Sequence, residues 1–514
     1  MKSTSCLRFC YVSILFLIVV LWSSCRKDFD YSTSSGNLEF SRDTVFIDTI
    51  FTNIGSSTYT LKVYNTSSTD IEIPTIQLAS GQNSMYRLNV DGTAGKNFQN
   101  IPLLANDSLF VFIETTVDIT DNGLSFLYTD ALQFDSGERQ QEVQLVTLVK
   151  DAVFIFPPTN PDGSKTTVLL GQDNEGNDIR VEGVELTDSQ LNFSNEKPYV
   201  IYGYAAVPED RTLTVEAGAR VHFHENSGIW VRPGATLQIN GSLSADTVLL
   251  EKEVIFEGDR LEPEFDAVAG QWGSVWLSNG SIANSIDHLT LKNATIGLFV
   301  EGDDLQASPT LTITNSQIYN SASVNLWGSN AKIVGANMVL GGAGAISLYC
   351  SLGGDYNFTH STIANYWSGG FRRGPALTID NEVSLTSGDK LQGNLLNASF
   401  VNCIVAGSNF KELDLFDNGN NDFNFSFDDC LIQFDGDSDN PLFDFTNTTY
   451  YNSIFLNENF DFKNAFQNDF RLGSESFALD SGQINSALQV PLDILGTDRT
   501  SSPDLGAYEF TVEE

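Results

Sequence analysis

The stretch LTVEAGARVHFHENSGIWVRPGATLQINGSLSAD, residues 213–246, contains the repeat that decides the fold. Its pattern Val215-x-x-Gly218-x-x-Val221-x-Phe223 recurs 16 residues later, beginning at Val231. Each copy reads as a short strand, a glycine turn and a second short strand. We therefore expect this part of the chain to be a β repeat structure.

A second repeated pattern runs through the C-terminal half of the chain. Each copy has an apolar residue, a turn residue two positions later, then a small residue, then another apolar residue. The turn positions of the seven copies are Asn293, Asn315, Gly335, His360, Asn402, Asp429 and Asn452. The intervals between them are 22, 20, 25, 42, 27 and 23 residues, and the interval of 42 is nearly two coils or one coil with an insertion.

These intervals predict a parallel β-helix. A unit of 20 to 27 residues built from short strands cannot bury its apolar face alone, whereas stacked coils bury it in a shared core. The Asn, Asp and Gly residues at the turn positions suit a corner with a left-handed backbone.

The cysteines of the C-terminal half fit the same pattern. Cys403 and Cys430 directly follow turn residues, where other copies have Ala or Ser. We interpret them as small interior side chains in neighbouring coils, and a disulfide between them is the alternative. With Cys350 they make an odd number in an exported protein, and no Cys/His spacing indicates a zinc site.

Residues 195–510 resemble the right-handed parallel β-helix proteins of Bacteroidota, including those grouped with pectate-lyase-like and periplasmic copper-protein-like repeats. Residues 213–246 and QWGSVWL at 271–277 resemble the first coils of that group. FALDSG at 477–482 and SPDLGAYEF at 502–510 resemble its terminal signature. The resemblance implies the fold but no particular activity, because this fold occurs in lyases, hydrolases, epimerases, adhesins and stalks.

The N-terminal half has the pattern of an all-β sandwich over residues 38–152. Apolar residues occupy every second position in several segments, for example Leu109, Val111 and Ile113. TNIGSSTYTLKVYN at 52–65 resembles a strand pair of the immunoglobulin-like modules of the spindle/hydin type. We interpret residues 153–198 as a linker that leads into the β-helix, and residues 199–514 as the β-helix itself.

The first 24 residues read as a secretory signal peptide. The apolar run YVSILFLIVVLW at 11–22 follows two basic residues and is too short to span a bilayer. Ser23, Ser24 and Cys25 then resemble the lipobox of bacterial lipoproteins, in which the cysteine is acylated. A plain signal peptide followed by a chance cysteine is the alternative.

The lipobox resemblance implies a lipid anchor at Cys25 in the bacterial outer membrane, which makes membrane lipid a partner. The charged run at 26–30 resembles the surface-export signals of Bacteroidota lipoproteins, and the protein would face either the cell surface or the periplasm. We interpret residues 25–37, which include the Ser/Gly stretch from Ser32, as a flexible tether.

Composition excludes several classes of protein. The 514 residues include 66 acidic and 27 basic side chains, a formal net charge of −39, which disfavours nucleic acid and anionic membrane surfaces as partners. A hydrophobic content of 41% with 11% aromatic residues is too high for a disordered chain.

Two patterns were weighed as metal sites. His222 and His224 share one face of a strand, but we place them on the solvent face and find no third ligand, so the sequence predicts no metal centre. The acidic and amide-rich clusters at 418–422, 428–429 and 435–439 could bind calcium, but their spacing matches no known calcium motif.

The candidate ligand site lies in the segment between His360 and Asn402. Aromatic rings suit sugars and guanidinium groups suit carboxylates, which selects four residues: Tyr366, Trp367, Arg372 and Arg373. The alternative is that the two aromatic residues cover the side of the helix and the arginines pair with nearby acidic residues.

Two functions are compatible with these patterns. The first is a non-catalytic envelope lipoprotein whose β-helix serves in binding or adhesion, possibly of a glycan. The second is a carbohydrate-active enzyme, a polysaccharide lyase or glycoside hydrolase, acting on the flank near Arg373. The sequence contains no nucleophile-elbow, P-loop or dinucleotide motif, so we find no catalytic residue and no cofactor by motif.

Overall fold

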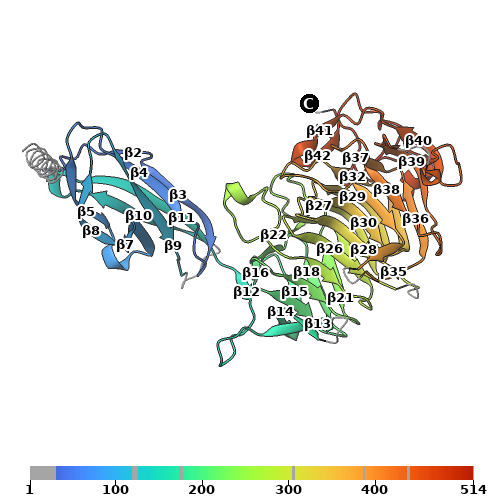
Figure 1. Ribbon diagram of the computed structural model, residues 1–514, viewed down its shortest axis with the longest axis horizontal. Helices are drawn as coiled ribbons and strands as arrows, with labels where there is room; N and C mark the ends of the chain where they lie inside the picture. The colour runs from blue at the N-terminus through green and yellow to red at the C-terminus, as the bar shows by residue number, and fades with distance from the viewer. Residues whose placement is uncertain are drawn as a thin grey trace, which may run out of the picture. The chain divides into compact units, whose positions relative to one another are not determined.

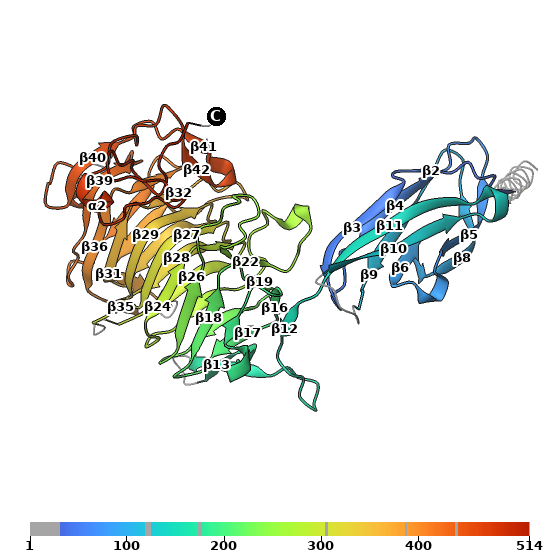
Figure 2. The ribbon, with the colours of Figure 1, turned by 180° about the vertical axis from the view of Figure 1, so that it is seen from behind.

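The computed structural model describes residues 31–118, 125–172, 177–303, 307–385, 388–436 and 440–512. The chain divides into two compact units, Met1–Lys150 and Asp151–Glu514, which Figures 1 and 2 show from opposite sides. The predicted signal peptide and Cys25 lie outside the described residues. None of the described helices is both long enough and apolar enough to cross a membrane.

The first unit is the predicted β-sandwich. One sheet has the order β1-β5-β10-β11-β3 with β8 beside β5, and the other has the order β2-β4-β9-β6-β7. The bounds are β1 (Ser32–Thr33), β2 (Glu39–Phe40), β3 (Thr44–Phe51), β4 (Tyr59–Tyr64), β5 (Ile71–Leu78), β6 (Tyr86–Val90), β7 (Thr93–Gly95), β8 (Asn97–Leu103), β9 (Ser108–Thr115), β10 (Ser125–Phe134) and β11 (Gln141–Lys150). Alternate residues point inward, so Leu109, Val111 and Ile113 of β9 are buried.

The tether prediction is wrong for its last residues. Ser32–Thr33 forms β1, which pairs with β5 in a parallel register. Ser34 is buried and donates a hydrogen bond of 2.7 Å to the Asp135 carboxylate, which also accepts one from the backbone N–H of Gly36. The sandwich therefore starts at Ser32, because these backbone and side-chain bonds hold the Ser/Gly stretch against it.

The second unit is the predicted parallel β-helix. A 17-stranded sheet bends along its length to form two faces of the helix. Its strands are β12 (Val153–Ile155), β15 (Asn192–Phe193), β16 (Tyr199–Ile201), β18 (Thr212–Glu216), β19 (Arg220–Phe223), β21 (Thr236–Asn240), β22 (Val254–Gly258), β24 (Asn284–Asp287), β25 (Leu289–Lys292), β27 (Leu311–Tyr319), β29 (Lys332–Gly341), β31 (Gly354–Thr359), β32 (Thr362–Asn365), β36 (Leu395–Val401), β37 (Ile404–Gly407), β39 (Ser426–Ile432) and β40 (Tyr451–Leu456).

A 10-stranded sheet forms the third face. Its strands are β13 (Thr167–Gln172), β14 (Asp178–Glu185), β17 (Tyr204–Val207), β20 (Gly228–Val231), β23 (Val275–Leu277), β26 (Ile296–Glu301), β28 (Val324–Ser329), β30 (Ile346–Ser351), β33 (Leu377–Asp380) and β38 (Leu413–Phe416). All pairs in this sheet are parallel except β13 with β14. Figure 1 shows the strands stacked in chain order from green to red.

The region predicted as a linker supplies the first rungs of this helix. Within residues 153–198, β12 pairs with β16, β14 with β17 and β15 with β18, each in parallel. These strands cover the open end of the first coil, where the sheets would otherwise present unpaired backbone groups.

The 16-residue repeat is not the length of a coil. Val215 pairs with Ile239, 24 residues later, whereas Val231 lies in the 10-stranded sheet. The match arises because successive corners of one coil join two strands through a glycine with positive φ, 81° at Gly218 and 77° at Gly234. The repeat therefore relates successive sides of a coil.

The predicted turn column exists, at the bend of the 17-stranded sheet, with φ between 47° and 54°. Its residues are His288, Asn315, Asn337, His360, Asn402, Asp429 and Ser453. Amide groups form hydrogen bonds from coil to coil, as in the 2.8 Å bond from Asn337 to Asn315 and the 3.0 Å contact between Asn402 and His360.

Three of the seven predicted turn positions are wrong. Asn293 belongs to the next corner of its coil, where Asn320 donates a hydrogen bond to it. Gly335 lies two residues before the true corner and Asn452 one residue before it. The 42-residue interval is one coil with insertions, because it adds only β33 to the 10-stranded sheet and a separate hairpin, β34 (Glu382–Ser384) with β35 (Lys390–Gln392).

The three described cysteines are free and buried, as interior side chains in a packed column should be. The Cys403 thiol lies 3.5 Å from the Phe358 carbonyl oxygen, and the Cys430 thiol 3.4 Å from that of Phe400. The interpretation of Cys403 and Cys430 as small interior fillers is confirmed, and the disulfide alternative is not formed.

The C-terminal residues cover one side of the stack. They include β41 (Phe462–Asn464), β42 (Asp469–Leu472) and the short helix α2 (Ile484–Ala487). Phe470, Ala507 and Tyr508 pack against Val339 and Ala364 of the 17-stranded sheet.

Candidate functional site

The longest connections of the β-helix gather at one corner, where each coil passes from the 17-stranded sheet into the 10-stranded sheet. We call this edge the loop corner. Its turns are residues 202–203, 224–227, 259–274, 293–295, 320–323, 342–345, 366–376 and 408–412. Two cavities open here, and loops on a rigid repeat scaffold are where function usually resides.

The first cavity, which we call the Trp367 cavity, has a volume of about 420 Å³ and includes the predicted residues Tyr366 and Trp367 in its lining. Polar side chains come from three separate parts of the chain: Asp266, Asn320, Gln467 and Asn468. Tyr319 and Phe466 add aromatic surface, and the Phe466 ring is 61% exposed.

The two predicted aromatic residues have different roles. The Tyr366 ring packs edge-to-face against Phe462 and Phe466, with ring centroids 6.1 and 5.6 Å apart. Burial raises the pKa of Tyr366 to about 12. Tyr366 thus attaches the C-terminal segment to the coil, whereas Trp367 lies over the backbone of Gly344 and Gly369 and borders the cavity.

The ligand role predicted for Arg372 is wrong. Its side chain is 4% exposed and the Glu412 side chain is fully buried. The two form a bidentate ion pair, with Nη1 2.9 Å from Oε2, and Glu412 also accepts hydrogen bonds from the backbone N–H groups of Ala376 and Asn409. Arg372 is therefore unavailable to a ligand, because its charge is used to join the 366–376 and 408–412 turns.

Arg373 faces the other way. It is exposed, as is Phe371 at 90%. The nearby Phe410 ring is 81% exposed, and a hydrogen bond from Asn409 to the Gly374 carbonyl holds the two loops together. Neither arginine lines the Trp367 cavity.

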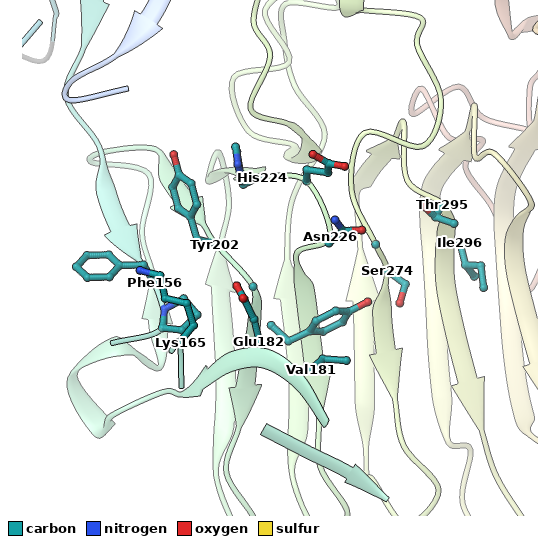
Figure 3. A pocket seen from close by; sticks show the side chains of 15 residues that line it. Phe156, Lys165, Val181, Glu182, Tyr202, His224, Asn226, Ser274, Thr295 and Ile296 are labelled. Atoms are coloured by element: carbon teal, nitrogen blue, oxygen red, sulfur yellow. The ribbon is translucent and has the colours of Figure 1, made fainter. Parts of the chain in front are cut away.

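The second cavity, which we call the His224 cavity, has a volume of about 890 Å³ and lies at the first coils of the loop corner (Figure 3). Aromatic surface comes from Phe156, Tyr202 and Tyr204. Charged and polar side chains surround these rings: Lys165, Glu182, His224, Glu225, Asn226, Ser274 and Thr295. Its volume falls within the range of about 300–1,000 Å³ typical of pockets for small ligands.

His224 is held in place at this cavity by Asp259. The imidazole Nδ1 lies 2.7 Å from Oδ2 of Asp259, whose side chain is 6% exposed. The Tyr202 ring covers the imidazole, with centroids 4.4 Å apart. Its hydrogen bond with Asp259 raises the pKa of His224, and burial raises that of Tyr202 to about 12. Because the His224 side chain is 46% exposed, its free edge can reach a ligand.

His222 does not join His224 in a metal site. The expectation that His222 lies on the solvent face is wrong, because it is 6% exposed and covered by Glu257, whose Oε1 lies 3.5 Å from Nδ1. The two imidazoles thus meet different carboxylates. Across the described residues, no group of three or more His, Cys, Asp or Glu side chains is arranged to hold a metal ion.

The amide-rich segment 418–422, which could have bound calcium, is a hydrogen-bonded turn. The Asn418 side chain contacts Asn381 and Asn421, and Asn421 donates to Asn394. Asp429 occupies a backbone corner. Residues 437–439 of the third acidic cluster lie outside the described residues.

An aromatic ladder on the outer face of the 10-stranded sheet could also suggest a sugar site. It consists of Trp230, Trp276, Phe299, Trp327 and Tyr349, with centroid separations of 4.8 to 6.3 Å. Each ring covers a face of the next, and the indole N–H groups donate to Ser278, Glu301 and Ser351. The ladder therefore stabilises the sheet and leaves mainly ring edges to solvent.

The sequence matches no model of a protein family and no curated protein. Among solved structures, the catalytic unit of a GH87 α-1,3-glucanase from Streptomyces thermodiastaticus aligns over 72% of this chain and 74% of its own, with 11% identity and a TM-score of 0.26. A family 123 glycoside hydrolase from Clostridium perfringens aligns over 22% of this chain and 26% of its own, with 8% identity and a TM-score of 0.16.

A PapD-like domain of human CEP192 aligns over 25% of this chain and 94% of its own length, with 12% identity and a TM-score of 0.15. The match to the family 123 hydrolase spans about a quarter of that protein. The fold of this chain is established by the strand pairing described above and not by these similarities.

Proposed function

We propose that this protein is a lipid-anchored protein of the bacterial outer membrane whose β-helix binds a glycan through the Trp367 cavity. The observation that supports this proposal is the combination of Trp367 and Phe466 with three amide side chains, those of Asn320, Gln467 and Asn468. A sugar ring has an apolar face that packs on an aromatic ring, and hydroxyl groups that bond to amides.

Trp367→Ala is expected to weaken binding of the best neutral hexasaccharide on a glycan array by roughly tenfold, because it removes the largest ring at the cavity. Calorimetric titration measures the change. Phe371→Ala is the matched control, since that ring belongs to the same loop and does not line the cavity. Equal affinity of the Trp367 variant and the wild type would remove the glycan site from this cavity.

The lipid anchor has its own test. Cells grown with an alkyne analogue of palmitate should label the wild-type protein at Cys25 and leave a Cys25→Ala variant unlabelled. Cys350→Ala controls for labelling of other thiols, because that cysteine is fully buried. Labelling of the Cys25 variant would refute the lipobox interpretation.

A further inference from the structure

The His224 cavity takes no part in the glycan site proposed above, although it is the larger of the two. Its aromatic residues are well placed to contact a ligand, since Phe156 is 59% exposed and Tyr202 and Tyr204 are partly exposed. Four separate segments of the chain supply its side chains, and Figure 3 shows them around one space.

The wall of this cavity is built by stacked turns that are bonded to each other. The backbone N–H of Gly203 donates to the Ser227 hydroxyl at 2.7 Å, and that of Gly273 donates to the Ser227 carbonyl at 2.8 Å. The N–H of Thr295 then donates to the Gly273 carbonyl at 3.1 Å. The wall therefore keeps its shape without a ligand, which lowers the cost of ordering on binding.

Glycines allow these turns to approach so closely. A Cβ on Gly203, where φ is 64°, would lie 2.7 Å from the Glu182 carbonyl oxygen. A Cβ on Gly273 would lie 2.5 Å from the Tyr204 hydroxyl. The aromatic and acidic sides of the cavity are therefore fixed relative to one another.

The charges in the cavity do not favour an anion. Glu182 and Glu225 face a single permanent cation, Lys165, and the positive charge of a protonated His224 is offset by Asp259. The wider field has the same sign, because the chain carries 66 acidic and 27 basic residues. A uronate or sulfate group would enter against this field.

The same set of groups suits uncharged hydroxyls. A sugar hydroxyl both donates and accepts hydrogen bonds, so it can donate to Glu182 or Glu225 and accept from Lys165 or Asn226. Hydrogen bonds to charged groups are stronger than neutral ones. The apolar face of the sugar can pack on Phe156.

We propose that the His224 cavity binds a neutral sugar unit of a glycan and discriminates against acidic sugars. This inference rests on the proposed glycan-binding function, and it adds a second site and the charge class of its ligand. It departs from the expectation that arginines would select a carboxylated polymer.

The test uses the full chain with cellohexaose, maltohexaose, laminarihexaose and mannohexaose as neutral probes and hexagalacturonate as the acidic probe. The wild type should bind at least one neutral probe, and hexagalacturonate roughly tenfold more weakly or not at all. Phe156→Ala should weaken the neutral probe about three- to tenfold by removing the stacking ring. The control Ile179→Ala changes an exposed apolar residue of β14 outside the cavity.

The charge prediction has its own pair of variants. Glu182→Gln/Glu225→Gln should narrow the preference for the neutral over the acidic probe by roughly tenfold, because two nearby negative charges are removed. Glu196→Gln/Glu209→Gln removes the same charge from exposed positions outside the cavity and should leave the preference unchanged.

The outcomes separate the two proposals. If Trp367→Ala weakens a neutral probe but neither Phe156→Ala nor the Glu182/Glu225 pair has an effect, the second site is refuted and the glycan-binding function stands. Tighter binding of hexagalacturonate than of every neutral probe refutes the charge class. If the wild type binds none of the neutral probes, both proposals fail.

Discussion

Replacing Arg372 with alanine is expected to lower the free energy of unfolding of the β-helix by about 3–5 kcal/mol. The guanidinium is 4% exposed and forms a bidentate pair with the fully buried Glu412. The variant leaves that carboxylate in the interior with the backbone N–H groups of Ala376 and Asn409 as its remaining partners. Urea denaturation of the wild type and the variant measures the difference.

The loss should depend on pH in a defined direction. Burial already raises the pKa of Glu412, and Arg372 opposes this rise. Without Arg372 the pKa rises further, so Glu412 is protonated more readily in the folded than in the unfolded chain. The variant should therefore lose stability as the pH rises through the folded-state pKa, and its deficit should be smallest in acid.

Two controls isolate the ion pair. Arg373→Ala changes an exposed neighbour and should stay within about 0.5 kcal/mol of the wild type. Arg372→Met/Glu412→Leu removes both charges and should recover most of the stability lost by the single variant. If Arg372→Ala is as stable as Arg373→Ala, the buried pair contributes nothing to the fold.

The fold could be predicted because its rules are local and repeated. Inward positions of every coil must be apolar, and a corner with positive φ favours Asn, Asp or Gly, so both features recur in the sequence. The register was less certain because a shift of two residues keeps the same side chains inward. That is how Gly335 was taken for Asn337, while Asn315 and Asn402 were placed correctly.

The binding residues could be predicted only in part. Tyr366 and Trp367 were found because the long interval marked an insertion, and they do line a cavity. Arg372 was misassigned because its burial depends on Glu412, 40 residues away in another loop. No local spacing announces such a partner.

The His224 cavity illustrates a second limit. His224 was noticed as part of His-x-His, which is a metal-like spacing, but its partner Asp259 lies 35 residues later. Phe156 and Glu182 come from the region interpreted as a linker, which gave no reason to place them beside a histidine. Such a site exists only once the coils are stacked.

Phe400→Ala is expected to cost about 3–5 kcal/mol of stability, because it empties the middle of an aromatic column. Phe400 is fully buried and stacks between Phe358 and Phe427, with ring centroids 5.6 and 4.9 Å away and planes within 11° of parallel. The three rings come from paired positions of successive coils, so backbone pairing holds them at a fixed spacing. Urea denaturation followed by circular dichroism provides the measurement.

The alternative to this packing argument is that any loss of phenylalanine weakens the protein. Phe371→Ala tests it, because that ring is 90% exposed and its loss should cost at most about 0.5 kcal/mol. Phe400→Leu should fall between the two, since leucine fills part of the space but loses the stacked ring faces. The cost should therefore follow the volume and shape left in the column. Equal costs for Phe400→Ala and Phe371→Ala would show that the column does not carry the stability of the stack.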